Sequence, residues 1–209
     1  MKKIITSIFV AIAMLAAMAP AASAQFRYGA TLGADFSTLK FKQDLITIDR
    51  CVGPEAGITT EMMFPGIGFG LGSGILYQMK GANLHLGEKK VWEGYGNERA
   101  FLHYLHIPVN LKFKWTRMNG LEDYVAPFVY GGPSIGFLLG HSHIPALKYP
   151  LADIGLEVGF GVEVLKKWQI SAVHNWGVTY CAQTKLLDDF SAKNRSWSVR
   201  LVYFFSRKK

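Results

Sequence analysis

The amino-acid sequence predicts an all-β protein: a transmembrane, antiparallel, up-and-down β-barrel of about eight strands that follows a cleaved signal peptide. Three observations lead to this prediction. Long segments alternate with a period of two, one face of these segments carries no charge, and aromatic residues gather at both ends of that face. Together these features are typical of strands whose outer face meets lipid.

The first residues have the composition of a signal peptide. Lys2 and Lys3 precede an apolar core over 4–18, and small residues end the segment at Ala24. We therefore expect residues 1–24 to be removed and residues 25–209 to form one barrel domain, because no linker divides them. No later segment has the run of about 20 apolar residues that a membrane-spanning helix needs.

Strands are predicted where apolar and polar residues alternate, since successive side chains of a strand point to opposite faces. Five segments alternate clearly: 26–36, 67–79, 101–115, 154–164 and 197–205. Three fainter ones are 52–63, 124–138 and 168–180. In the five clear strands the apolar face has no Asp, Glu, Lys or Arg, whereas the other face has seven. A soluble sandwich would place its charges outside, so we interpret these strands as a barrel with a polar lumen.

The ends of the strands predict the topology. Aromatic residues lie at both ends of the apolar faces, as in the two interfacial girdles of membrane barrels. The connections 64–66, 116–123 and 165–167 are short, and the connections 37–51, 80–100, 139–152 and 181–193 are long. Short turns face the periplasm in such barrels, so both termini are predicted to be periplasmic.

Segment 124–138 shows least clearly which of its residues face the lipid and which face the lumen. Pro127, Gly131, Gly132, Pro133 and Gly136 interrupt both of its faces. Because proline cannot donate to a strand ladder, we expect a bulge or register break near Gly131.

Five charged residues are predicted to meet in the lumen near the short turns, because the alternation points all of them inward. We expect Arg27 to pair with Glu61 on the neighbouring strand, and Lys112 and Lys114 to reach across toward Glu163. Charges in a narrow lumen are costly unless they are paired, so this network should plug the barrel. The alternative is that these residues lie at the rim and are solvated.

Histidine and cysteine residues raise further possibilities. A surface hydrolase could use His141, Ser142 and His143, which lie in a long loop near Asp153, and a metal could bind His141 and His143, although solvated loop residues are the commoner case. We predict no enzyme, no cofactor and no metal. Cys51 and Cys181 lie at outer strand ends in an oxidising compartment and could form a disulfide. Two strands separate them, which works against the bond.

The net charge limits the classes of partner that we expect this protein to bind. The formal charge of +8 becomes +6 without Lys2 and Lys3. An exported chain without a basic helix argues against nucleic acid, so outer-membrane lipid and lipopolysaccharide are the expected partners. Lys89, Lys90 and Arg99 in the second long loop could meet lipid phosphates, or could simply be solvated.

Several runs of residues resemble a known family. YLHIPVNLKFK (104–114), APFVYGGPSIGFLL (126–139) and DIGLEVGFGVEV (153–164) are similar to the PorT-like outer-membrane β-barrel family of Bacteroidetes. The resemblance covers the mature chain and implies an outer-membrane barrel, with a role near protein secretion for one branch. Two departures are His106, where members commonly have an acidic residue, and the end Ser206-Arg207-Lys208-Lys209 after Phe205. The family supplies no site residues.

Two functions remain open at this point. The first is a structural or interaction barrel, whose outer loops or periplasmic rim contact an unknown protein or lipopolysaccharide. The second is a small transport barrel for ions or an apolar ligand. Eight strands leave room only for their own side chains, which favours the first. In either case the barrel-assembly machinery is the expected partner during insertion.

Overall fold

The structure is a computed structural model, and it describes residues 25–41, 47–64, 66, 68–85, 97–116, 120–142, 147–184 and 191–205. The predicted signal peptide, residues 1–24, lies outside these residues.

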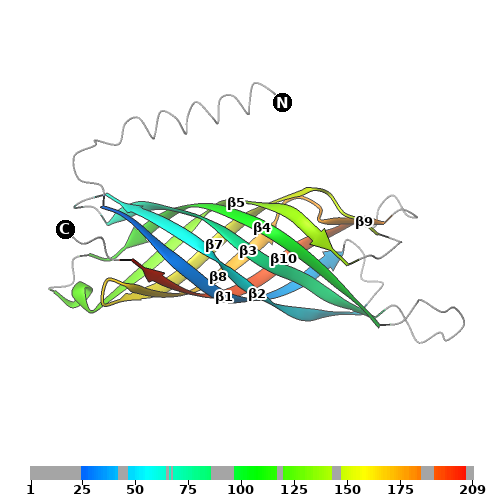
Figure 1. Cartoon of the computed structure of the whole chain (residues 1–209), viewed down its shortest axis with the longest axis horizontal. Coiled ribbons are helices and arrows are strands. Elements are labelled where there is room, and N and C mark those ends of the chain that lie inside the picture. Colours follow the sequence, from blue (N-terminus) through cyan, green and yellow to red (C-terminus); the bar gives the residue numbers. More distant parts are fainter. Residues whose placement is uncertain are drawn as a thin grey trace, which may run out of the picture.

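Eight long antiparallel strands close into a barrel, because the first strand pairs with the second on one side and with the last on the other. Figure 1 shows the elongated cylinder that results. Its strands are β1 (Gln25–Phe41), β2 (Thr47–Met63), β3 (Phe69–His85), β4 (Asn97–Lys114), β5 (Val125–His141), β7 (Ala152–Val164), β8 (Trp168–Gly177) and β10 (Ser191–Phe204). The short strands β6 (Leu147–Lys148) and β9 (Ala182–Thr184) and a single helical turn, η1 (Leu121–Asp123), lie in connections. The predicted eight-stranded barrel is confirmed. Among the described residues, no helix has the length and apolarity to cross a membrane.

The two ends of the barrel differ. The connections 64–68, 115–124 and 165–167 lie at one end, which we call the turn end. The first strand begins and the last strand finishes there as well, with Gly29 opposite Phe204 (Figure 1, left). The other end, which we call the loop end, carries the connections that contain β6 and β9.

An apolar belt surrounds the barrel. Outward residues along the strands are aliphatic or aromatic, and Leu32, Ile58 and Phe160 remain about 60% exposed. Aromatic rings pack in pairs at the turn end of the belt, with ring centroids 4.8 Å apart for Phe69 and Phe113 and 4.6 Å apart for Trp168 and Tyr203. An apolar surface this extensive is stable only against lipid, because exposed apolar patches on soluble proteins are far smaller.

The predicted register break near Gly131 is wrong. β5 keeps one continuous register with β7 from Val125 to Phe137. Its register with β4 is the same before and after Gly131 and shifts only at His103 and Tyr104. Pro127 and Pro133 both fall on outward positions of the alternation, so neither disturbs the lumen side.

The first long predicted connection, 37–51, is largely strand, and strand also occupies part of the other three, so those boundaries are also wrong. Only residues 42–46 separate β1 from β2, and β3 and β4 continue well past the apolar alternation. A membrane strand needs about 9–11 residues, so strands of 17 or 18 residues project from the lipid. The alternation fades there because water meets both faces of the strands.

Beyond the belt the strands separate into two small sheets. The pairing between β1 and β2 ends at Ser37 and Cys51. Farther out, β1 pairs with β10, which pairs with β9, which pairs with β6. The outer part of β2 pairs with β3, which pairs with β4. We call these sheets the β1 blade (38–41, 191–194, 182–184 and 147–148) and the β2 blade (47–50, 82–85 and 97–101).

A closed ring has no free edge within the membrane, so it should resist detergent unfolding. We expect unheated protein in mild detergent to migrate differently from heated protein in gel electrophoresis, and to give a circular dichroism spectrum dominated by strand. Identical mobility before and after heating, together with a helical spectrum, would contradict the fold.

Candidate functional site: the lumen networks

The five charged residues predicted to face the lumen lie together near the turn end. Arg27 forms an ion pair with Glu61, its direct neighbour across β1 and β2, and its Nη2 lies 2.6 Å from an oxygen of Glu163. The ammonium of Lys114 lies 2.7 Å from Glu163 and 3.0 Å from Glu61. Lys112 completes the group through Glu61. These five residues and Gln169 are called the turn-side network.

Lys112 was expected to reach Glu163, and that detail is wrong. Its ion pair is with Glu61, and its ammonium donates to the side-chain oxygen of Gln169 at 2.7 Å. Gln169 in turn donates to Glu61 at 2.9 Å and to Glu163 at 2.7 Å. An amide can donate and accept at once, so Gln169 joins groups that charge alone would not connect.

Aromatic rings support the cations of this network. The ammonium of Lys112 lies 4.0 Å from the ring centroid of Phe128, and the guanidinium of Arg27 lies 4.4 Å from that of Phe204. A cation over a desolvated ring gains electrostatic energy from the ring face. The network therefore holds three cations, two carboxylates and two aromatic walls together, with Glu61 almost fully buried and Arg27 partly exposed.

A second set of charges, which the sequence reasoning missed, lies at the middle of the barrel. Arg200 on β10 contacts Glu157 at 2.8 Å and Glu55 at 2.5 Å. His106 lies 2.9 Å from Glu157. Asn110 donates to the other oxygen of Glu157 at 3.3 Å. Each of these five side chains is buried. We call them the central network.

The sequence did contain a signal for the central network. Arg200 and Glu157 occupy the same inward phase of their strands as the turn-side charges. The expectation was restricted to residues near the short turns, so these charges were left out. His106 stands where the resembling family commonly has an acid, and here its ring lies against a carboxylate.

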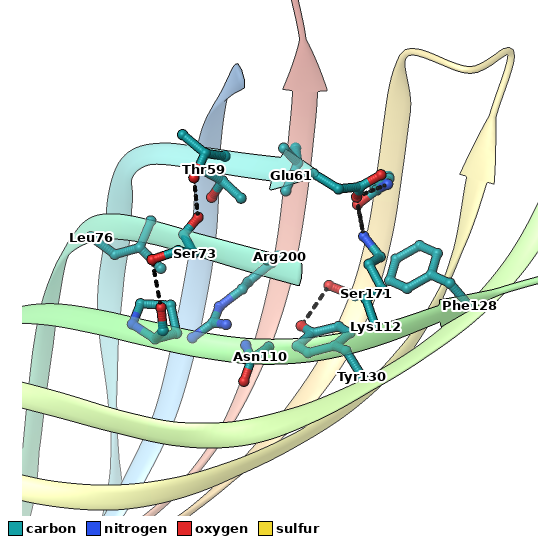
Figure 2. Close-up of a pocket in the computed structure, with 15 residues that line it drawn as sticks. Thr59, Glu61, Ser73, Leu76, Asn110, Lys112, Phe128, Tyr130, Ser171 and Arg200 are labelled. Atoms are coloured by element: carbon teal, nitrogen blue, oxygen red, sulfur yellow. Dashed lines mark hydrogen bonds and ion pairs between the residues drawn. The ribbon is translucent and has the colours of Figure 1, made fainter. Parts of the chain in front are cut away.

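A small cavity lies between the two networks. Its volume is about 50 Å³, and Glu61, Lys112, Tyr130, Ser171 and Arg200 are among the residues that line it. In Figure 2, Lys112 points toward Glu61, and Tyr130 points toward Ser171. One water needs roughly 10–15 Å³ of such volume, so the cavity has room for only a few waters.

A third polar layer closes the lumen nearer the loop end. Asn194 on β10 donates to Asp153 at 2.7 Å, and Thr179 donates to the other oxygen of Asp153 at 2.9 Å. Asp35 and Lys80 are also buried in this part of the lumen. Polar side chains therefore fill the barrel along its length.

Glycine makes room for the larger lumen side chains. At Gly159 a Cβ atom would lie only 2.5 Å from the ring of Tyr130, so any side chain there would clash. This agrees with the interpretation of inward glycines as space for bulky neighbours.

Cys51 and Cys181 are both buried in the structure. Burial raises the pKa of the Cys181 thiol, which keeps it protonated. A disulfide between Cys51 and Cys181 stays a prediction, to be tested by comparing gel mobility with and without reductant.

The histidines considered for catalysis or metal binding have other contacts. The ring of His141 packs at a tilt against Tyr149, with centroids 4.5 Å apart, and the hydroxyl of Ser142 accepts a hydrogen bond from the backbone of Phe101. His143 lies outside the described residues, as do Lys89 and Lys90 and the side chain of Arg99. Within the described part of the chain, no three His, Cys, Asp or Glu residues are grouped to hold a metal.

Comparison with known proteins agrees with the fold. A family model described as an outer membrane protein beta-barrel domain matches residues 20–183. The solved structure of the outer membrane protein OprG from Pseudomonas aeruginosa is 13% identical, with a TM-score of 0.50, and the match covers 87% of this chain and 96% of OprG. Ail of Yersinia pestis, solved with the heparin analogue sucrose octasulfate, is 17% identical with a TM-score of 0.44. That match covers 87% of this chain and 99% of Ail. No protein with curated annotation matches.

Proposed function

Since the chain belongs to the outer membrane protein β-barrel domain family, we propose that it is a non-enzymatic, non-conducting barrel of the outer membrane that acts through the surfaces at its ends. The observation that carries this proposal is the filled lumen. Two buried ion-pair networks and a third polar layer occupy it, and the cavity between the networks is about 50 Å³. The alternative, a small transport barrel, would need these networks to rearrange.

The loop end is the surface that we propose for contact with a partner. There the β1 blade and the β2 blade leave the ring, and within the described residues their outer strands pair on one side only. An unpaired strand edge offers backbone donors and acceptors to another chain. A protein that adds an extended segment fits this surface better than lipopolysaccharide does, because lipopolysaccharide has no strand backbone to pair.

Photo-crosslinking in intact cells tests this function. A photoreactive residue at Asp49 in the β2 blade or at His141 on β5 should give discrete protein adducts, because both positions are exposed at the loop end. The matched control is the same residue at Gly120 at the turn end. Adducts at the control position alone would contradict the proposed surface.

We further propose that the turn end faces the periplasm, with residues 1–24 removed and the single domain 25–209 inserted by the barrel-assembly machinery. The short connections at the turn end support this orientation. The resemblance of 104–114, 126–139 and 153–164 supports placement in the PorT-like family of Bacteroidetes, in which one branch is implied to have a role near protein secretion.

Epitope insertion tests the orientation. A short epitope at Gly87, between β3 and β4, should be labelled by antibody on intact cells, while one at Asn119, between β4 and β5, should require a broken outer membrane. Connections tolerate such insertions better than strands do. The reverse labelling pattern would mean that the barrel is inserted the other way.

A further inference from the structure

A groove crosses the turn end at the seam where β1 meets β10. Its volume is about 720 Å³, and we call it the seam groove. The cationic side chains of Arg27, Lys166 and Lys167 line it together with the aromatic rings of Phe26, Tyr28, Phe204 and Phe205. Phe26 and Tyr28 are more than half exposed and belong to the apolar belt. The groove therefore joins a cationic rim to the lipid-facing surface.

The turn that carries the two lysines has an unusual backbone. Leu165 and Lys166 have φ angles of 52° and 60°, in the left-handed region that favours glycine and asparagine. A tight hairpin turn requires these angles, yet neither residue is one that normally supplies them. Non-glycine residues persist in this region only where their surroundings hold them, and such positions gather at binding sites.

Four hydrogen bonds hold this turn in place. Arg27 donates to the carbonyl of Lys166 at 2.9 Å, and the backbone of Leu165 donates to Tyr124 at 2.9 Å. The carbonyl of Lys167 accepts from Phe204 at 2.8 Å, and the amide of Lys167 donates to Val164 at 3.2 Å. The turn is thus preorganised against the barrel wall, so positioning its side chains for a ligand costs little entropy.

Among the described residues, those that line the groove include three cations and no carboxylate. The ammonium of Lys166 lies 2.6 Å from the carboxylate of Asp123, and this hydrogen bond raises the pKa of Lys166, so that the lysine stays charged. Lys167 is exposed, and within the described residues it has no ion pair.

We propose that the seam groove binds an anionic phospholipid, with its phosphate between Lys166 and Lys167 and its acyl chains along Phe26 and Tyr28. The ligand must have an anionic head and an apolar body, because the groove offers cations at the rim and aromatic rings toward the belt. This assignment rests on the proposed orientation, since phospholipid belongs to the leaflet that the turn end would meet.

Native mass spectrometry of protein from nanodiscs tests the proposal. The nanodiscs contain equal amounts of phosphatidylglycerol and phosphatidylcholine, and retained lipid is counted after detergent exchange. We expect the native protein to retain phosphatidylglycerol preferentially. The double variant Lys166→Gln, Lys167→Gln should retain at least fivefold less, because both rim cations are lost.

A matched control removes the same charge at the loop end, through Lys193→Gln with Arg195→Gln on β10. It should keep the native preference, and the heat-dependent gel shift verifies that every variant folds. Equal losses in both double variants, or no preference in the native protein, would overturn the proposal. Neither result bears on the closed lumen, which conductance tests separately.

Discussion

Replacing Arg200 with methionine should destabilise the barrel by roughly 3–5 kcal/mol, the cost of removing one partner from a buried ion pair. Arg200 is the cation between Glu55 and Glu157, and both carboxylates are almost fully buried. Without it, two negative charges face each other across the centre of the lumen. Methionine keeps much of the side-chain volume, so the loss of stability comes from the missing charge and not from a cavity.

Urea unfolding in detergent micelles measures this effect as the free energy of unfolding. Arg195→Met is the matched control, because Arg195 lies on the same strand but is exposed, and we expect a change within about 0.5 kcal/mol. Adding Glu157→Gln to Arg200→Met should recover part of the loss, since it removes one unpaired charge. An Arg200→Met protein as stable as the control would contradict the central network.

The Glu61→Ala variant should have a comparably large effect, again roughly 3–5 kcal/mol of lost stability. Glu61 binds Arg27, Lys112 and Lys114, so its removal leaves three cations with Glu163 as their only carboxylate in the turn-side network. Glu61→Gln should lose less, because an amide oxygen can still accept hydrogen bonds from the lysines.

The same unfolding measurement applies, with Glu122→Ala at the turn end as the control for losing an acidic residue. Combining Glu61→Ala with Lys112→Met should be less harmful than the sum of the single changes, because both partners of one ion pair are then absent. Strict additivity of the two losses would mean that Glu61 and Lys112 do not interact.

The alternation of residues predicted much of this structure, and the reason is physical. In a membrane barrel one face of every strand must be apolar. Arg27, Glu61 and Glu163 could therefore be assigned to the lumen face with no knowledge of their partners. The same rule covers Glu157 and Arg200, which the narrower expectation left out. The eight strands followed from counting the alternating segments, and their closure followed from the absence of free edges in lipid.

Contacts across the lumen could not be predicted in the same way. Which inward residues meet depends on the stagger between strands around the ring, and this stagger is not encoded in the alternation of any one strand. Arg27 and Glu61 are direct neighbours, so their pairing could be predicted. The pairing of Lys112 with Glu61 rather than with Glu163 could not. The blades were missed because strands outside the lipid lose the alternation that identifies them.

The turn with Leu165 and Lys166 shows another limit. The three residues of this turn include no glycine or asparagine, so they give no reason to expect two left-handed residues in succession. The angles come from closing β7 onto β8 in three residues, with Arg27 from a distant strand holding the turn. Contacts with distant strands set these backbone angles, so the conformational preferences of the turn residues do not predict them.

Single-channel recording in planar bilayers tests the central claim, that the lumen is closed by its own side chains. The native protein in concentrated potassium chloride should give no steady conductance above that of the bare bilayer. Glu61→Ala combined with Glu163→Ala should give brief openings, because the remaining cations of the turn-side network lose their partners and admit water. A large, steady conductance from the native protein would contradict the closed lumen and favour the transport barrel.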